Sequence, residues 1–201
     1  MTHVRLDEED HDRQGDKEFV SLFKQLLKAR TIFVEEVVTD ALSRKVHAAL
    51  VLMQQADEKA PVTVYVNSPG GSADSGFAIF DFMRFVKPPI RTVVSGLCAS
   101  AAVLIYLAAP KEKRFALPNA RFLLHQPSTM VFGSASDVAI NAEEIIKLRE
   151  RYNQIVSTET GKTVEQVTKD ADRDFWLSAA QAREYGLVGR IVKSYSEIEK
   201  A

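Results

Sequence analysis

The stretch SGLCASAAVLIYLAAP, from Ser95 to Pro110, is the longest apolar run of the chain, and the rest of the sequence is arranged around it. Small side chains dominate its first half and aliphatic side chains its second half. This composition predicts a buried helix that packs closely through small residues. One hydroxyl within it, that of Ser100, needs an explanation. A serine hydroxyl is a weak nucleophile unless a base removes its proton, so the question is which other residues reach it.

Composition limits the answers. The chain has 201 residues, of which 46% are hydrophobic, and this is enough for one domain with a sizeable core. The net charge of −1 gives no general attraction to nucleic acid or to an anionic membrane. The apolar run is too short, and too interrupted by glycine, cysteine and serine, to span a bilayer, which takes about 20 residues. We therefore expect neither nucleic acid nor a membrane as a partner.

The single cysteine, Cys98, excludes an intrachain disulfide and favours a reducing compartment. The first residues are polar and contain no apolar signal segment, so we expect a cytoplasmic protein. Residues 1–16 read as a mobile acidic tail, and residues 17–201 as one catalytic domain. No Cys/His cluster or paired carboxylates have the spacing of a metal site, and we expect no metal or cofactor.

Strands and helices are predicted to alternate along the whole chain, which indicates a single α/β domain with parallel strands. The residue patterns predict strands over 31–35, 61–69, 90–96, 113–117, 120–125 and 189–194. Helices are predicted over 17–29, 39–59, 70–86, 95–110 and 137–160, with Gly161 ending the last of these. Thr163 with Gln166, and Ser178 with Gln181, predict capping boxes that start two short helices, the second ending at Gly186.

Four histidines could supply the base. His3 and His11 lie in the polar tail and His47 in an amphipathic helix, where ordinary surface or core roles are favoured. His125 differs because it ends the apolar strand RFLLH, and α/β folds place functional side chains at strand ends. A buried histidine with satisfied hydrogen bonds is the alternative at that position.

Ser100 itself is predicted to lie just past a strand, in the first turn of a helix. Backbone N–H groups are unpaired there and the helix dipole favours nearby negative charge. The alternative is a small residue selected for close packing. The surrounding CASAA is not a GxSxG elbow, so an α/β-hydrolase has no support. Cys98 is the weaker candidate nucleophile, since a small buried thiol is usually inert.

Two further segments could complete a site. The turn NSPGGS, from Asn67 to Ser72, can present backbone N–H groups to an oxyanion, although a plain structural turn is equally consistent with it. The segment KDADRDFWLSAA offers Asp170, Asp172 and Asp174 as an orienting carboxylate. Asp174 is nearest to the apolar FWL and is expected to be half-buried.

Taken together, these motifs resemble the proteolytic subunit of the caseinolytic (Clp) protease family. The resemblance runs from about Phe19 to about Val192. NSPGG is similar to the family's oxyanion turn, ASAA to its Ala-Ser-Met-Gly around the nucleophile, and HQP to the segment of its base. RDFWLSAAQAREYGLV is similar to its Arg-Asp-x-Phe-Leu-Ser segment. The spacings of 25 residues from Ser100 to His125 and 49 from His125 to Asp174 also agree.

The resemblance implies a Clp protease/crotonase-like fold with repeated β-β-α units and a protruding handle helix. It implies a Ser100–His125–Asp174 serine endopeptidase inside a homo-oligomer of two stacked heptameric rings. Backbone N–H groups of Gly71 and Ala101 would form the oxyanion hole. The stretch 127–137 and its helix would be the handle, with Arg173 at the ring–ring contact.

The family also relies on a separate AAA+ ATPase that unfolds and delivers protein substrates. The resemblance implies a docking pocket for it that includes Tyr65 and Phe85. Thr63 stands where many members carry an aromatic residue, and the acidic N-terminus replaces an apolar gating segment; both put the identity of the ATPase in doubt. We expect the tail to disfavour acidic peptides at the pore.

Two departures fall closer to the site. Ala101-Ala102 replaces Met-Gly after the nucleophile, which changes the first specificity pocket, and STM replaces a glycine-rich stretch of the handle. Two other functions remain open. A non-catalytic subunit of a mixed ring would carry a broken triad. An acyl-CoA enzyme of the crotonase architecture would also use backbone N–H groups for an oxyanion, but would not need serine, histidine and aspartate at these three places.

Overall fold

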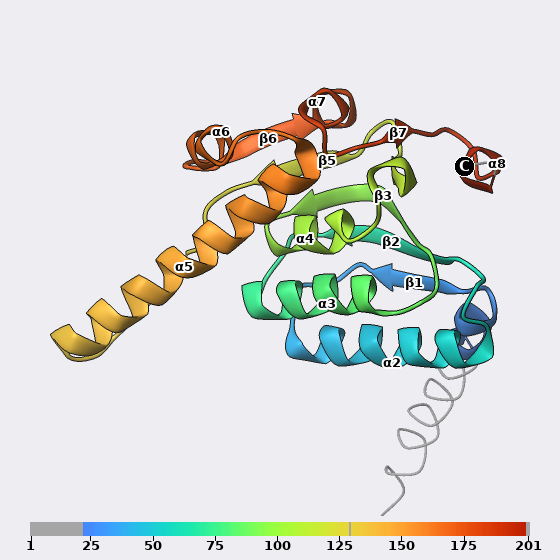
Figure 1. The fold of residues 1–201 in the computed structure, drawn as a ribbon, viewed down its shortest axis with the longest axis horizontal. Helices are drawn as coiled ribbons and strands as arrows, with labels where there is room; N and C mark the ends of the chain where they lie inside the picture. Colours follow the sequence, from blue (N-terminus) through green and yellow to red (C-terminus); the bar gives the residue numbers. More distant parts are fainter. Residues whose placement is uncertain (1–21, 129, 200–201) are drawn as a thin grey trace, which may run out of the picture.

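The computed structural model describes residues 22–128 and 130–199. The predicted acidic tail, with His3 and His11, lies outside the described residues. A helical segment over 22–28 leads into a sheet covered by helices (Figure 1). The strands are β1 (Thr31–Val34), β2 (Val62–Ser68), β3 (Ile90–Ala99), β4 (Arg114–Ala116), β5 (Arg121–Leu124), β6 (Phe175–Ser178) and β7 (Arg190–Ile191). The helices are α2 (Asp40–Ala56), α3 (Ala73–Phe85), α4 (Ala101–Leu107), the 3-10 turn η1 (Lys111–Lys113), α5 (Ala135–Thr160), α6 (Val164–Asp170), α7 (Ala179–Tyr185) and α8 (Ser196–Glu199).

The sheet runs in the order β1-β2-β3-β4-β7, and these neighbours are parallel. β5 pairs with the last residues of β3, and β6 adds to β5 as an antiparallel strand. The α/β class is confirmed. From β1 to α4, strands and helices alternate singly, and two strands precede a helix at β4, β5 and α5. Strand β3 therefore belongs both to the row β1-β2-β3-β4-β7 and to the branch β3-β5-β6. Segments from both parts of the sheet meet at the end of β3.

One prediction about the apolar run was wrong. The predicted strand and helix overlapped at Ser95 and Gly96, and Leu97–Ala99 were expected to be helical only; all of these residues belong to strand β3, and Ala101–Leu107 form helix α4. The cause is pairing: Leu97, Cys98 and Ala99 are in register with Arg121, Phe122 and Leu123 of β5. All seven residues of α4 are buried, which confirms that this helix is apolar because it lies in the core.

The predicted helix ends are largely confirmed. Gly161 and Gly186 end α5 and α7 with φ of 79° and 103°, in the left-handed region that glycine tolerates. Ser178 and Gln181 form the full capping box. Thr163 caps α6, but the side chain of Gln166 donates to Asp170 instead of returning to the cap, so only half of that box forms.

Helix α5 differs from the others because its two halves have different surroundings. Its C-terminal half packs on the core through Tyr152, Ile155 and Val156. Its N-terminal half extends beyond the rest of the described chain (Figure 1). Within residues 22–128 and 130–199, no helix is both long and apolar enough to cross a bilayer.

Candidate active site

Ser100 occupies a strained turn between β3 and α4. It is the N-cap residue of α4, one position before the helical turn in which it was expected, with φ 54° and ψ −125°. A side chain other than glycine in such a conformation costs about 1–3 kcal/mol, so the surroundings must enforce it. The Ser100 N–H donates to Leu123 O of β5 at 2.9 Å, which fixes the turn against the neighbouring strand.

The glycine turn after β2 lies directly against this serine. A Cβ atom at Gly70 would come within 2.6 Å of both Ala99 O and Ser100 Cβ, and one at Gly71 within 2.4 Å of Val38 O. Hydrogen bonds from Val38 N–H to Gly70 O and from Ser72 N–H to Val38 O, both 2.8 Å, hold the turn in place. Only glycine permits this approach, because any Cβ would collide with backbone atoms.

Two backbone donors near the serine are available. Among the residues that the structure describes, the N–H groups of Gly71 and Ala101 have no hydrogen-bond acceptor. Both residues line the same cavity as Ser100. Unpaired N–H groups beside a nucleophile can stabilise the negative charge that develops on a carbonyl oxygen under attack.

His125 directly follows β5 and reaches the same cavity. Its Nδ1 lies 3.4 Å from Asp174 Oδ1. The segment before Asp174 is held beside the histidine by hydrogen bonds from Gln126 N–H to Ala171 O at 2.8 Å and from Gln126 Nε2 to Asp172 O at 2.9 Å. A carboxylate in this position can orient an imidazole and stabilise its protonated form.

The expected burial of Asp174 was wrong. Its side chain is 63% exposed in the single chain, compared with 32% for His125. Asp174 lies just before β6, which pairs only with β5 among the described strands, so no neighbouring strand covers it. The apolar FWL that suggested burial follows on β6 itself, where Leu177 is buried and Trp176 remains 42% exposed.

A cavity of about 500 Å³ lies beside both Ser100 and His125, and Asp174 is not part of its lining. Its lining combines apolar and polar side chains from the glycine turn, α3, α4, the segment after β5, and α5. These residues are Pro69, Gly71, Ser72, Ala73, Asp74, Phe77, Ser100, Ala101, Leu104, His125, Pro127, Ser128, Asn141, Glu144, Ile145, Leu148 and Tyr152. A volume of this size accommodates side chains of a peptide beside the nucleophile.

Helix α5 also contacts the backbone of Ser100. The Tyr152 hydroxyl donates to Ser100 O at 3.4 Å, and burial raises the pKa of this tyrosine, so its proton is retained. The same helix therefore contributes to the cavity wall and contacts the backbone of the residue that would attack a substrate.

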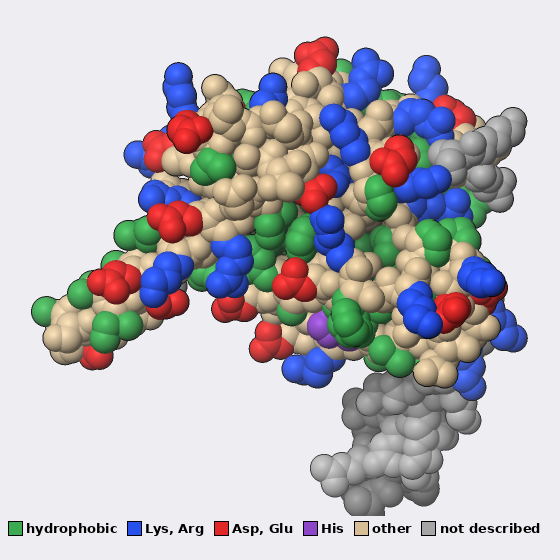
Figure 2. Space-filling model, in the orientation of Figure 1, with side chains coloured by type: hydrophobic (Ala, Val, Ile, Leu, Met, Phe, Trp, Pro, Cys, Tyr) green, Lys and Arg blue, Asp and Glu red, His purple; other side chains and the backbone are tan. Residues whose placement is uncertain are grey.

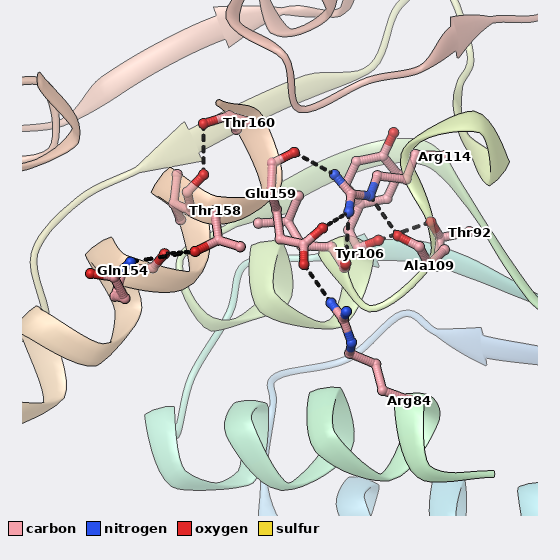
Figure 3. Close-up of polar contacts among 11 residues, drawn as sticks. Arg84, Thr92, Tyr106, Ala109, Arg114, Gln154, Thr158, Glu159 and Thr160 are labelled. Carbon is pink, nitrogen blue, oxygen red and sulfur yellow. Dashed lines mark hydrogen bonds and ion pairs between the residues drawn. The ribbon is translucent and has the colours of Figure 1, made fainter. Parts of the chain in front are cut away.

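A buried arginine holds the opposite end of α4 (Figure 3). Arg114, fully buried, donates to Leu107 O at 3.1 Å and to Ala109 O at 2.7 Å, at the C-terminal end of that helix. It also binds Glu159 of α5 through both the backbone O and Oε2, and the other carboxylate oxygen of Glu159 binds Arg84 of α3. Burial lowers the pKa of Arg114, and the Glu159 carboxylate acts in the opposite direction.

This network was missed at the sequence level. The only signal was Arg114 near the start of the apolar strand KRFAL. Burying its charge there is unfavourable unless the charge is paired. The three arms of the network connect the C-terminal ends of α3, α4 and α5. It thereby fixes the helix that begins at Ser100.

The remaining candidates lie elsewhere. Cys98 is buried, and burial raises the pKa of its thiol well above the ordinary value, which disfavours a thiolate nucleophile. The His47 ring packs on Phe82 at 4.3 Å, and its Nε2 lies 3.2 Å from Ala78 O, consistent with an ordinary role in its helix. Arg173 is exposed.

The two residues of the expected docking pocket belong to different clusters of the single chain. The Tyr65 ring stacks on Phe33 at 5.3 Å. Phe85, which is 80% exposed, lies 6.0 Å from Phe82. Thr63, which lies on the same strand as Tyr65, is buried and accepts a hydrogen bond from Arg91 Nε at 2.6 Å.

Comparison with known proteins identifies the family of the chain. The model of the family described as Clp protease matches residues 14–195. The chain belongs to the Clp protease family. A Clp protease relative, the ATP-dependent Clp protease proteolytic subunit 3 of Rhizobium meliloti, is 48% identical over 94% of this chain and 98% of its own length. The ATP-dependent Clp protease proteolytic subunit 2 of Treponema denticola is 41% identical over 95% of this chain and 94% of its own length.

Among solved structures, a mutant of ClpP1 from Listeria monocytogenes superposes with a TM-score of 0.82 at 38% identity, over 88% of this chain and 99% of that one. The predicted family and fold are therefore confirmed, and the chain is a serine-type endopeptidase of the Clp protease type. The coverage of both chains is nearly complete, so the likeness extends over the whole described fold.

Proposed function

We propose that Ser100, His125 and Asp174 form the catalytic triad of this endopeptidase, which hydrolyses peptide bonds of unfolded proteins and short peptides. The observation that carries the proposal is that Ser100 and His125 line one cavity while His125 Nδ1 lies 3.4 Å from the Asp174 carboxylate. The serine and histidine are not yet within a hydrogen bond of each other, and catalytic contacts of unliganded enzymes often tighten only when substrate binds.

In the proposed mechanism, Ser100 Oγ attacks the scissile carbonyl carbon as His125 takes the hydroxyl proton. The N–H groups of Gly71 and Ala101 bind the resulting oxyanion, the part of the reaction where fixed donors contribute most. The imidazolium then protonates the leaving amine as the C–N bond breaks, which gives an acyl-enzyme. Water, deprotonated by His125, attacks the acyl carbon and regenerates the Ser100 hydroxyl.

The test uses matched pairs of variants. Ser100→Ala should abolish both peptide hydrolysis and labelling by a serine-directed phosphonate, whereas Ser95→Ala, at an exposed serine of the preceding strand β3, should retain both. Asp174→Asn should lower kcat by several orders of magnitude because the imidazole loses its orienting carboxylate, whereas Asp172→Asn should have little effect. Wild-type turnover in Ser100→Ala protein would exclude the mechanism.

We further propose that the chain works as two stacked heptameric rings that enclose the cavities, in the cytoplasm, with a separate AAA+ ATPase that delivers unfolded proteins. Exposed apolar residues support an assembly: Met130 and Phe132 are 80% and 86% exposed, and Ile140 is 60% exposed. Hydrophobic side chains lie in the open on the projecting end of α5, between acidic and basic ones (Figure 2). Exposed apolar groups gathered on one element are typical of a subunit contact.

In this assembly Arg173 would lie at the ring–ring contact, and Tyr65 and Phe85 would form the ATPase-docking pocket between neighbouring subunits. Light scattering should give a native mass near fourteen times the 22.4 kDa of the chain. The isolated assembly should cleave short unstructured peptides and leave folded proteins intact. A fully active monomer at micromolar concentration would contradict the ring proposal.

A further inference from the structure

The charges on the cavity beside Ser100 are of one sign. Apart from His125 and the buried, protonated Tyr152, the ionisable side chains of its lining are Asp74 and Glu144, and the described lining contains no lysine or arginine. Glu144 Oε1 already pairs with Lys147 Nζ at 2.6 Å. The Asp74 carboxylate has no hydrogen-bond or ion-pair partner in the described part of the chain. Asp74 is therefore the uncompensated charge of the cavity.

Asp74 is exposed in the single chain. It lies in the first turn of α3, where the helix dipole favours a negative charge. The next helical turn brings Phe77 to the same side, and both residues line the cavity. The nearby cation, Arg151, packs its guanidinium over the Phe77 ring at 5.1 Å and is not part of the cavity lining.

Much of the remaining wall is apolar, although Ser72, Ser128 and Asn141 also line it. Phe77 and Leu104 come from α3 and α4, and Ile145 and Leu148 from α5. A cavity with an apolar wall and one carboxylate without a partner fits a side chain with a long aliphatic stem and a cationic end, since such a stem packs on apolar surface while its charge finds a partner. A purely aliphatic side chain would use the walls and leave the Asp74 charge without a partner.

We infer that this cavity selects lysine or arginine at the substrate residue whose carbonyl is attacked, with Asp74 as the residue that determines this specificity. The inference rests on the proposed function, because that function places the scissile bond at Ser100. The alternatives that the same cavity allows, an aliphatic or an acidic side chain, differ from it in charge and can be separated experimentally.

The experiment compares two fluorogenic peptides that differ at that residue alone, lysine against norleucine, which keeps the stem and lacks the ammonium group. For the wild-type assembly we expect kcat/KM to be about fivefold higher for the lysine peptide, the scale of a partly exposed ion pair. Asp74→Asn should bring the ratio close to one. Asp81→Asn, at an exposed aspartate of the same helix outside the cavity, should leave both the ratio and the activity unchanged. Raising the salt concentration should reduce the ratio in the wild type only.

A binding measurement separates this inference from the proposed function. Both peptides are titrated into Ser100→Ala protein and into Ser100→Ala/Asp74→Asn protein, so that affinity is measured without turnover. Tighter binding of lysine that disappears with Asp74→Asn supports the inference. Equal affinities in the Ser100→Ala protein, or a lysine preference that survives Asp74→Asn, overturn it. If the binding preference holds but the wild type hydrolyses neither peptide, the proposed function fails, and only the preference of the cavity for a cationic side chain stands.

Discussion

The two ends of helix α5 are built from the same kinds of residue and have opposite surroundings. At its C-terminal end, Val156 is fully buried and Glu159 is bound to the buried Arg114. At its N-terminal end, Val138 and Ile140 are exposed, and Glu144 pairs with Lys147 at the surface. A valine or a glutamate on this helix can thus contribute much or little to the stability of the chain, depending on which residues cover it.

This difference shows which part of the helix one chain can hold by itself. The C-terminal end of α5 is fixed by contacts within the chain. Through Arg114 it holds the end of helix α4, and through Tyr152 it holds the backbone at Ser100. The N-terminal end has apolar side chains without a cover in the described chain, so its stability depends on another molecule. Substitutions placed in matched pairs at the two ends should separate these roles.

The largest effect is expected from Glu159→Gln. Arg114 would keep its buried charge without the carboxylate, and breaking a buried pair by removing one partner costs about 3–5 kcal/mol of unfolding free energy. The control is Glu144→Gln at the projecting end, where an exposed pair contributes less than about 1 kcal/mol. Urea denaturation at one fixed protomer concentration measures both, because assembly adds to apparent stability. Equal losses in the two variants would mean that Arg114 does not need Glu159.

Val156→Ala should come next. Removing two buried methyl groups costs about 2 kcal/mol, at about 0.8 kcal/mol for each carbon group removed. Val138→Ala is the matched change at the projecting end, where the side chain is 43% exposed, and should stay within about 0.5 kcal/mol. Thermal unfolding followed by circular dichroism compares them. A loss at Val138 as large as that at Val156 would show that the projecting end is covered more fully than the single chain indicates.

Tyr152→Phe should have a smaller effect, about 0.5–1 kcal/mol, since it removes one long hydrogen bond to Ser100 O and keeps the ring. The hydroxyl contacts the backbone of the nucleophile, so kcat should fall a few-fold with KM nearly unchanged. Tyr195→Phe, at a tyrosine that is 55% exposed, controls for loss of a hydroxyl elsewhere. Unchanged kinetics in Tyr152→Phe protein would confine this tyrosine to a packing role.

The smallest effect on the fold itself is expected from Ile140→Asn. Its side chain is 60% exposed, so the secondary structure of the chain should be retained. The native mass, however, should fall, because a polar group would replace an apolar one at the proposed subunit contact. Glu143→Gln on the same half of the helix is the control. Retention of the full native mass by Ile140→Asn would place the contact elsewhere.

The sequence predicted the fold well wherever one segment carried its own pattern. The alternating strands and helices, the glycine ends of α5 and α7, and the burial of α4 all follow from local periodicity and turn residues. The error at Ser95–Ala99 arose because small apolar residues fit a strand or a helix equally well. Pairing with β5 decides between them, and no local pattern contains that information.

The candidate site was predicted because motifs that occur in order resemble those of the Clp protease family, whereas the network that supports it was not predicted. Ser100, His125 and Asp174 are recognisable because three motifs occur in order. Arg114 and Glu159 are 45 residues apart and belong to no motif, so their contact becomes visible only in three dimensions. The exposure of Asp174 depends in the same way on its neighbours in space, which are few at the edge strand β6.

Because α5 is long and is packed on the core near one end, a small rotation at that end produces a large displacement at the other. At a rise of about 1.5 Å per residue, the arm from the Ile155 anchor to the first turn at Ala135 measures roughly 30 Å. A rotation of about 5° at that anchor would displace the tip by roughly 3 Å, while residues beside Ser100 would shift by only a fraction of this. A molecule that binds the tip therefore acts over a long distance on the cavity wall formed by Ile145 and Leu148. A small force applied far from the nucleophile is transmitted to the place where a substrate side chain would lie.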